Sequence, residues 1–334
     1  MNKITLNKHK KAYEISKYWV DKIGLDLSGL NVLTEVGSNS YTYLPLIASL
    51  SGANVTAWCN DSKFGIADKI ILDAKNAIKI WDCKGPIIFR SNDRNFDDIQ
   101  SADILTNSGM LRPLDSQFLG FVKSNTVISL MFESWEFRST DIDLNFCKEK
   151  GIKVSGVSEN NAVMNIFEYT GILACKLILN SGIEIFQSKI LIWSSDEFGE
   201  IAKKWISKLL PKNIIICNES EKFYHYLENV DLVYFCDYHE DRPYFGPVGF
   251  LNLETITRIN STVTFCHLYG NISKSECNKY GISLFPDKDG NNKVMSETLS
   301  FVGAEPVIQL LVAGLKSAQE TIEGGSYVCA QRII

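Results

Sequence analysis

Two of the four histidines in this chain follow neighbouring β-rich runs. His239 lies in the polar run DYHEDR after residues 232–236, and His267 follows the apolar run VTFC. Because imidazole has an unperturbed pKa of about 6.5, a histidine at a strand end can pass a proton in either direction near neutral pH. We predict that His267 is catalytic, with a half-buried ring bonded to the backbone as the alternative. His239 is a candidate cofactor contact, with a solvated loop residue as the alternative.

Arg112, Asn107 and Ser108 follow an earlier β-rich run, at residues 103–106. An arginine fork beside amide and hydroxyl donors suits a small carboxylate, because parallel charge-assisted hydrogen bonds orient a planar anion. We therefore predict that these three residues bind substrate. The structural alternative for Arg112 is an ion pair within the protein.

Carboxylates follow the next β-rich run, at residues 126–132. Glu133 and Glu136 are three residues apart, and Arg138 is close enough in sequence to pair with either of them. We predict that Glu133 acts as a general acid or base if burial raises its pKa, and that Arg138 contacts substrate. A salt bridge among these side chains is the alternative. Glu35 ends the first β-rich run and is expected at the same edge of the sheet.

The stretch SKILIWSSDEFGEIAKKWISKLL is typical of a buried strand, a tight turn and an amphipathic helix. Such a unit opens a doubly wound domain, in which the free N–H groups of the first helical turn attract a pyrophosphate. The glycine fingerprint G-x-G-x-x-G is reduced here to Gly199, near the third position. Ser194 and Ser195 are small enough for the turn and can donate to a phosphate. We predict that these three residues bind the cofactor.

Short β-rich runs alternate with helical runs, which is the pattern of a parallel sheet covered by helices. We predict an α/β fold with two Rossmann-like, doubly wound parallel-sheet domains joined by a buried inter-domain helix. Residues 1–160 are predicted to form a flavodoxin- or Rossmann-like substrate domain, and residues 161–305 a Rossmann-like nucleotide-binding domain. The apolar segment 161–180 is assigned as the inter-domain helix, and a helix at 306–322 has the length to return to the first domain. The predicted strands are 31–36, 54–58, 86–90, 103–106, 126–132, 153–157, 189–193, 213–217, 232–236, 262–266 and 282–285, and the remaining helices are 10–24, 41–50, 66–80, 115–122, 142–150, 200–209, 221–227, 253–259 and 273–280.

Composition limits the classes of function that are open to the chain. A net charge of −5 without a basic stripe argues against nucleic acid as a partner. The sequence has no run of about 20 apolar residues and no secretory signal pattern, so we expect no membrane insertion and a cytoplasmic protein. The nine cysteines are an odd number without a C-x-x-C pair, and they are predicted to be reduced core thiols. No cluster has metal-ligand spacing, so no metal is expected.

Two segments resemble a known family. TDIDLNFCKEKGIKVSGV, residues 140–157, is similar to the segment "vDniDleaakerGIpVvnv" of the formate/glycerate dehydrogenase superfamily, which includes the D-2-hydroxyacid dehydrogenases. ADILTNSGMLRPL resembles the family's "aDallvrs" strand and the loop that contacts the substrate carboxylate. The resemblance implies NAD or NADP as cofactor, a small carboxylate-bearing substrate in an inter-domain cleft, and a homodimer. It also implies that Asn218 and Glu219 stand where the family grips the adenosine ribose.

The chain departs from this family at two catalytic positions. Tyr269 precedes Gly270 where the family has an arginine, and the segment LSFVGAEP lacks the family's late histidine. The main prediction is an NAD(P)-dependent oxidoreductase acting on a small carboxylate-bearing substrate. One alternative is a degenerate scaffold that binds a ligand or a partner without a dinucleotide, because the fingerprint glycines and the family's arginine and histidine are missing and the carboxylates of Asp196 and Glu197 would repel a phosphate. The other is a non-redox enzyme with a ligand such as S-adenosylmethionine, motivated by Gly37 after a strand.

Overall fold

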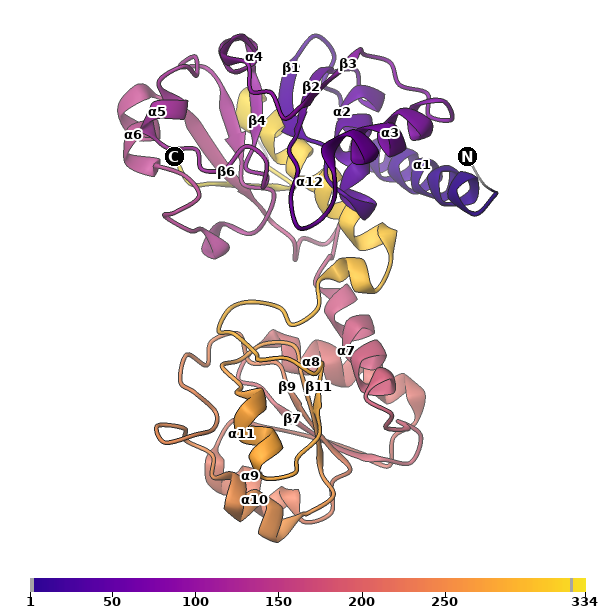
Figure 1. Cartoon of the computed structure of the whole chain (residues 1–334), viewed down its shortest axis with the longest axis vertical. Helices are drawn as coiled ribbons and strands as arrows, with labels where there is room; N and C mark the ends of the chain where they lie inside the picture. Colours follow the sequence, from indigo (N-terminus) through magenta and orange to yellow (C-terminus); the bar gives the residue numbers. More distant parts are fainter. Residues whose placement is uncertain (1–2, 325–326) are drawn as a thin grey trace. The chain divides into compact units, whose positions relative to one another are not determined.

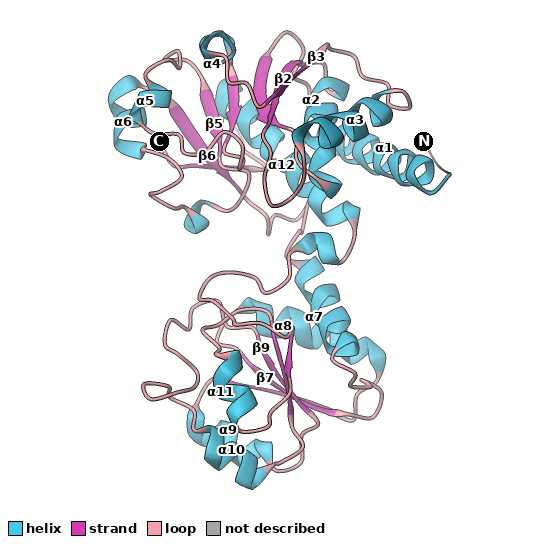
Figure 2. Cartoon of the chain, viewed as in Figure 1, coloured by secondary structure: helices cyan, strands magenta, loops and turns pink. Residues whose placement is uncertain are grey.

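The computed structural model describes residues 3–324 and 327–334, and the chain divides into two compact units. Unit 1 consists of Met1–Ile166 and Ala304–Ile334, and unit 2 consists of Phe167–Gly303. Each unit is a sheet of mostly parallel strands with helices packed on it (Figures 1 and 2). The predicted fold class, two doubly wound α/β domains, is therefore confirmed. Within the described part of the chain, no helix is long and apolar enough to cross a membrane.

Unit 1 is built on a seven-stranded sheet with the order β12-β6-β5-β4-β1-β2-β3. Its central strands are short and wholly buried, as the ILT of β4 and the VIS of β5 show. Such strands are expected where helices cover both faces of a parallel sheet. All pairings are parallel except that of β12 with β6. The strands are β1 (Asn31–Glu35), β2 (Asn54–Cys59), β3 (Ile87–Ser91), β4 (Ile104–Thr106), β5 (Val127–Ser129), β6 (Lys153–Val157) and β12 (Ala330–Arg332).

Helices from the two terminal parts of the chain pack together in unit 1. Helix α12 (Ala304–Glu323) packs against β5 and β6, and α1 (Lys3–Ile23) packs on α12. Figure 1 shows the indigo α1 and the yellow α12 in the same unit. The hydroxyl of Ser129 donates to the carbonyl of Gly314, so polar contacts also join the sheet to α12. The other helices are η1 (Asn39–Tyr43), α2 (Leu44–Leu50), α3 (Ala67–Ile78), α4 (Phe96–Ser101), α5 (Ser116–Leu119), η2 (Ser134–Glu136) and α6 (Leu144–Lys150).

Unit 2 is a five-stranded parallel sheet with the order β11-β10-β9-β7-β8. Successive residues of its strands face opposite sides, so Leu191 and Trp193 join one apolar cluster while Ile190 and Ile192 join another. The strands are β7 (Lys189–Trp193), β8 (Asn213–Cys217), β9 (Leu232–Phe235), β10 (Thr264–His267) and β11 (Leu284–Phe285). The helices are α7 (Glu168–Asn180), α8 (Glu197–Ile206), η3 (Ser207–Leu209), α9 (Ser220–Leu227), α10 (Leu253–Ile259), α11 (Lys274–Lys279) and η4 (Leu299–Phe301).

Some elements differ from the sequence-based expectation. The helix expected over 161–180 begins only at Glu168, because the side chain of Asn161 accepts from the N–H groups of Val163 and Met164 and forms a turn instead. Asn165 also has a left-handed φ of 48°. The resulting helix α7 belongs to unit 2, where it packs against α8. Strand β12 and helix α4 were not predicted, because each is too short to show a periodic apolar pattern.

The strand orders identify the edges at which ligands bind in open α/β sheets. In unit 1 the six parallel strands follow the order 3-2-1-4-5-6 that dinucleotide-binding domains use, and in unit 2 the order is flavodoxin-like. The order reverses between β1 and β4 in unit 1 and between β7 and β9 in unit 2. Ligand sites in such sheets lie at these switch points, beyond the carboxyl ends of the strands. Both switch points hold carboxylates in this chain.

Candidate functional site

The switch point of unit 2 is closed by two aspartates, which we call the aspartate clasp. Asp196 lies in the turn after β7, and its Oδ2 accepts from the N–H of Tyr238, in the turn after β9, at 2.7 Å. Asp237 lies in the turn after β9, and its Oδ2 accepts from the N–H of Ser195, in the turn after β7, also at 2.7 Å. Each carboxylate thus reaches across the switch point to the turn of the other strand. The clasp, Asp196 and Asp237, joins the two turns by reciprocal hydrogen bonds.

The clasp also uses the amides at the start of α8. Oδ1 of Asp196 accepts from the N–H of Phe198 at 3.0 Å and from the hydroxyl of Ser194 at 2.8 Å. Burial raises the pKa of Asp196, while hydrogen bonds from Tyr238 and Ser194 oppose the rise. An N-cap aspartate of this kind satisfies helix-terminal donors from within the protein.

The predicted cofactor residues do not present a free anion site. A pyrophosphate at this helix needs unpaired N–H groups, but those of Ser195 and Phe198 already donate to the clasp. The hydroxyl of Ser194 is likewise bonded to Asp196. Gly199 does keep the packing role of a third fingerprint glycine, because a Cβ there would lie 2.6 Å from Cβ of Ser194. These residues, as arranged, do not fit a dinucleotide.

The other residues predicted to contact the cofactor lie at the same edge but are taken up by local contacts or exposed. Asn218 is exposed just after β8, and the carboxylate of Glu219 accepts from Lys222 at 2.6 Å. His239 is exposed, and its N–H donates to Asp237. The structure therefore brings these side chains near strand ends without making them converge on one hydrogen-bonded site.

His267 lies in the interior of unit 2. Its side chain is fully buried at the end of β10, with Nε2 3.3 Å from the carbonyl oxygen of Pro286. Burial lowers its pKa to about 4, so the ring is neutral at physiological pH. The contact with Pro286 matches the structural alternative, a buried histidine bonded to the backbone. This placement gives no support to proton transfer by His267 to a ligand.

The switch point of unit 1 holds Glu35, the last residue of β1. Its side chain is 9% exposed, and its Oε2 accepts from the N–H of Met110 in the loop after β4 at 2.8 Å. Burial raises the pKa of Glu35, while the Met110 N–H and the charge of Arg112 oppose the rise. A carboxylate thus stands at the place where this sheet is expected to bind its ligand.

Asn107 and Ser108, predicted to contact substrate, follow β4 at this edge and are both buried. The hydroxyl of Ser108 lies 2.9 Å from that of Thr106, which in turn lies 2.8 Å from that of Thr34 in β1. Asn107 Oδ1 accepts from Arg112, whereas its buried Nδ2 has no hydrogen-bond partner. A buried amide donor without a partner is costly, and a ligand acceptor at this edge would satisfy it.

Arg112 is held by the protein on several sides. Its Nε donates to Oδ1 of Asn107 at 3.0 Å, and one terminal nitrogen donates to the Asn107 carbonyl at 2.7 Å. The other terminal nitrogen lies 3.3 Å from Oδ2 of Asp141, and the guanidinium stands over the ring of Phe132. The structural alternative, an internal ion pair, is present with Asp141, and the hydrogen bonds of the guanidinium to Asn107 also stay within the protein. Arg138 is exposed, and its charge acts on Glu136.

Three more glutamates gather beyond the ends of β5 and β6. Oε1 of Glu133 accepts from the N–H of Glu159 at 2.7 Å, which ties the two strand ends together. Burial raises the pKa of Glu136 to about 7, and the charge of Glu133 adds to the rise. Burial, with the charges of Glu136 and Glu133, raises the pKa of Glu159 well above its ordinary value. We call these three residues and Glu35 the glutamate edge.

Tyr41 and Glu159 belong to this edge and were missed in the sequence. Burial raises the pKa of Tyr41, and the charges of Glu35 and Glu159 add to the rise. Tyr41 had been assigned to a helix, and it lies instead in the single turn η1. Glu159 closely follows a correctly placed strand, so the rule that found Glu133 would also have found it.

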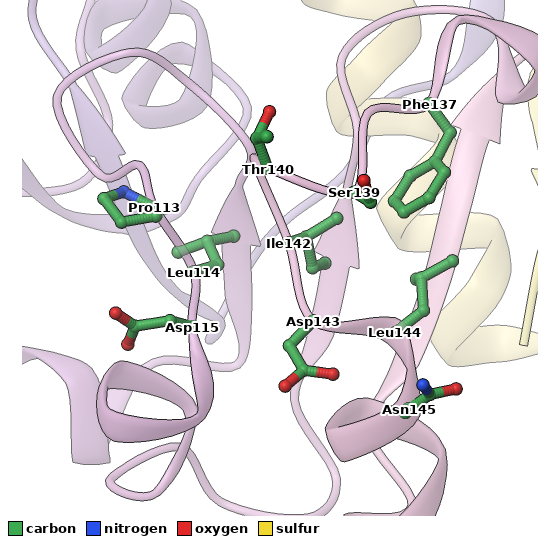
Figure 3. Close-up of a pocket in the computed structure, with 10 residues that line it drawn as sticks. All are labelled: Pro113, Leu114, Asp115, Phe137, Ser139, Thr140, Ile142, Asp143, Leu144 and Asn145. Atoms are coloured by element: carbon green, nitrogen blue, oxygen red, sulfur yellow. The ribbon is translucent and has the colours of Figure 1, made fainter.

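A groove of about 500 Å³ opens in unit 1, lined by residues 113–115, 137, 139, 140 and 142–145 and by none of the four glutamates (Figure 3). Its apolar wall includes Leu114, Ile142 and Phe137, and Asp115 and Asp143 lie at its lower end in the figure. Each of these aspartates caps a short helix, α5 or α6, through one carboxylate oxygen. Among the described residues, no group of histidine, cysteine, aspartate and glutamate side chains could hold a metal ion.

Comparisons with known proteins extend the description of the fold. No protein-family model matches the sequence, and no curated protein matches it. A dipicolinate synthase from Bacillus halodurans is 13% identical, with a TM-score of 0.56 over 90% of this chain and 100% of that chain. The pyruvate reductase of Chlamydomonas reinhardtii is 12% identical, with a TM-score of 0.53 over 89% of this chain and 97% of that one. The dipicolinate synthase of Bacillus subtilis is 11% identical, with a TM-score of 0.56 over 90% of this chain and 99% of that one.

Identity at this level is informative about fold and says nothing of activity. The similar structures span both units of the chain and nearly their own full lengths. The predicted resemblance in fold is therefore confirmed. The chain has the two-domain α/β fold of these dipicolinate synthase and pyruvate reductase structures.

Proposed function

We propose that the glutamate edge of unit 1 is the working site of this chain and that it binds a small ligand carrying a cationic amine. On this proposal unit 2 is a scaffold that works without a dinucleotide. The observation that carries it is the gathering of four glutamates at one sheet edge, with raised pKa values for Glu35, Glu136 and Glu159. Perturbed carboxyl groups at a ligand-binding edge are typical of functional sites.

The charge of the edge supports an amine as the ligand. Burial raises the pKa values of Glu35, Glu136 and Glu159, and repulsion between neighbouring carboxylates adds to the rise for Glu136 and Glu159. A cationic amine between them would favour their ionised forms and form charge-assisted hydrogen bonds. Binding would then lower the pKa values of Glu136 and Glu159 and release protons to the solvent. A small anion gains less here, because Arg112 is already bonded to Asn107 and Asp141.

The raised pKa of Glu136, about 7, also suits general acid–base chemistry near neutral pH. Glu136 would give or take a proton at a carboxyl oxygen, and the charge of Glu133 would help to set its proton affinity. Such chemistry needs no nicotinamide. It differs from the non-redox alternative drawn from the sequence, which required a ligand such as S-adenosylmethionine.

A second candidate is the NAD(P)-dependent oxidoreductase acting on a small carboxylate-bearing substrate. It is favoured by the fold shared with the pyruvate reductase of Chlamydomonas reinhardtii. It requires the clasp residues Asp196 and Asp237 to leave the amides of Ser195, Phe198 and Tyr238 before a pyrophosphate could bind. The homodimer and the cytoplasmic location stay predictions on either proposal.

Isothermal titration calorimetry distinguishes the two candidates. We expect 1,4-diaminobutane to bind and the neutral 1,4-butanediol not to bind. Binding of the diamine should release protons from the protein, which is measured by titrating in two buffers of different ionisation enthalpy. Glu159→Gln should weaken this binding about tenfold, because one charge-assisted contact is lost. Glu149→Gln, at an exposed position of α6, is the matched control and should bind as the natural chain does.

A titration with NADH and NADPH, followed by tryptophan fluorescence, completes the test. Trp193 lies on β7 directly before the turn that carries Asp196, so a bound dinucleotide should change its emission. We expect no saturable change up to near-millimolar concentration. Saturable dinucleotide binding together with no diamine binding would overturn the proposal in favour of the oxidoreductase.

A further inference from the structure

The C-terminal strand β12 reaches the glutamate edge through one side chain. Oε1 of Gln331 accepts from the N–H of Ser134 at 3.0 Å. Ser134 is the first residue of η2, the turn that lies between Glu133 and Glu136. The two positions that meet here are 197 residues apart in the sequence, so only the tertiary structure brings them together.

A glycine in β6 makes this contact geometrically possible. Gln331 pairs with Gly156 in the register of β12 and β6. A Cβ on Gly156 would lie 2.7 Å from the nitrogen of Ser134 and 2.9 Å from its Cα, so any side chain there would push the turn away. With glycine at this position, η2 lies directly on β6 and within reach of Gln331.

Helix α12 fixes β12 in place. The carboxylate of Glu320, 5% exposed, accepts from the N–H groups of Val328, Cys329 and Ala330 at 3.1, 2.9 and 2.8 Å. The N–H of Ser158 donates to the carbonyl of Cys329 at 2.7 Å. The strand is therefore held by both α12 and the residue after β6. Because its backbone is already ordered, placing Oε1 of Gln331 beside the turn costs little further conformational entropy.

We propose that Gln331 is a positioning residue for the glutamate edge, holding in place the turn that carries Glu133 and Glu136. This inference rests on the proposed function, because it concerns the same site. The C-terminal strand thereby controls how closely these carboxyl groups approach one another and a bound amine. A backbone N–H deprived of its acceptor would turn toward water and take the adjacent side chains with it.

Two variants at this position separate positioning from charge. Gln331→Met keeps the length of the side chain and removes the acceptor, so the turn should loosen and Glu136 should become more exposed. The pKa of Glu136, followed by NMR of its side-chain carboxyl carbon, should then fall from about 7 toward 4.5, and 1,4-diaminobutane should bind about tenfold more weakly. Gln331→Glu keeps an acceptor for the Ser134 N–H and should restore most of the pKa rise of Glu136.

Arg332→Met on the same strand is the control, since Arg332 is exposed, and neither readout should change. A lower melting temperature of Gln331→Met with an unchanged Glu136 pKa would show a merely structural role and overturn the inference. If the natural chain does not bind the diamine, the proposed function fails, and the Glu136 pKa in Gln331→Met still decides the inference. If Gln331→Met binds the diamine as tightly as the natural chain does and the Glu136 pKa does not change, the inference is rejected. The proposed function is then unaffected.

Discussion

Both units place carboxylates at the switch point of a parallel sheet, but the two sets of carboxylates differ in their partners. The clasp of unit 2 is bonded to backbone N–H groups, with Asp237 alone accepting from those of Ser195, His239 and Glu240. In the glutamate edge of unit 1, Glu35 and Glu133 each accept from a backbone N–H, and burial with neighbouring carboxylates raises the pKa values of Glu136 and Glu159. The carboxylates of the clasp are bonded to the amides of their own unit, whereas the glutamate edge contains carboxyl groups whose ionisation is disfavoured.

A shared fold fixes where a ligand can bind but does not fix whether it binds. In both units the carboxyl ends of the strands bring chemistry-bearing residues to one edge. Asp196 and Asp237 accept from amides of their own turns and of each other's turns. In unit 1, Glu35 and Glu133 each accept from an amide beyond another strand, and burial raises the pKa values of Glu35, Glu136 and Glu159. Substitutions and pH changes in each unit test this difference.

The largest expected effect is that of Asp237→Ala. The change leaves the N–H groups of Ser195, His239 and Glu240 without their acceptor, so we expect the free energy of unfolding to fall by about 4 kcal/mol. Urea denaturation measures this change in the free energy of unfolding. Glu200→Ala, at an exposed position of α8, is the control and should change that free energy by less than about 0.5 kcal/mol. Equal stability of the two variants would mean that the clasp does not hold unit 2 together.

The next effect is the acid lability of unit 2. The folded-state pKa of His267 is about 4, below its ordinary 6.5, so the unfolded chain binds a proton more readily. Stability from this residue is complete above pH 6.5 and is lost as the pH falls toward 4, by about 3 kcal/mol. Hydrogen exchange of amides in β10 and its neighbours measures this loss, which His267→Leu should remove. If the stability of unit 2 still falls with decreasing pH in His267→Leu, another group causes the acid lability.

Unit 1 should show a pH dependence of the opposite sign. The folded-state pKa of Glu136 is about 7, above its ordinary 4.5, so the folded chain holds the proton more tightly. Its contribution is complete below pH 4.5 and is lost as the pH rises through 7, by about 2 kcal/mol after allowance for partial exposure. Hydrogen exchange of the β5 and β6 amides checks the loss, and Glu136→Gln should flatten it. A rise in unit 1 stability over this range would contradict the desolvation of Glu136.

The smallest effects compare one glycine from each edge. A Cβ on Gly199 would lie 2.6 Å from Cβ of Ser194, so Gly199→Ala should cost about 1.5 kcal/mol in unfolding free energy. A Cβ on Gly109 would meet only Oε2 of Glu35, at an ordinary 3.5 Å, so Gly109→Ala should cost less than about 0.5 kcal/mol. Thermal denaturation of the two variants measures the difference. The reverse order would mean that unit 1 is the more tightly closed edge.

Much of the fold could be predicted from the sequence, because strands and helices of this kind carry local patterns. The apolar runs at 189–193 and 213–217 coincide with β7 and β8, and the internal strand β7 is apolar at each of its four buried positions. The helix expected to begin at residue 161 begins at Glu168, because the side chain of Asn161 competes with the helix for the backbone. Strand β12 is short, and it exists because β6 and Glu320 bind it.

The sequence by itself determined which residues stand at the ends of parallel strands, and so it named Glu133, Arg112 and His267 as candidates. Only the tertiary structure decided which of these are available to a ligand, because burial and hydrogen bonding depend on neighbours from distant parts of the chain. His267 is enclosed near Pro286, Arg112 is bonded to Asn107 and Asp141, and Glu133 is joined by Glu159. The pKa of a side chain depends on its neighbours in the folded protein, and the local sequence does not specify those neighbours.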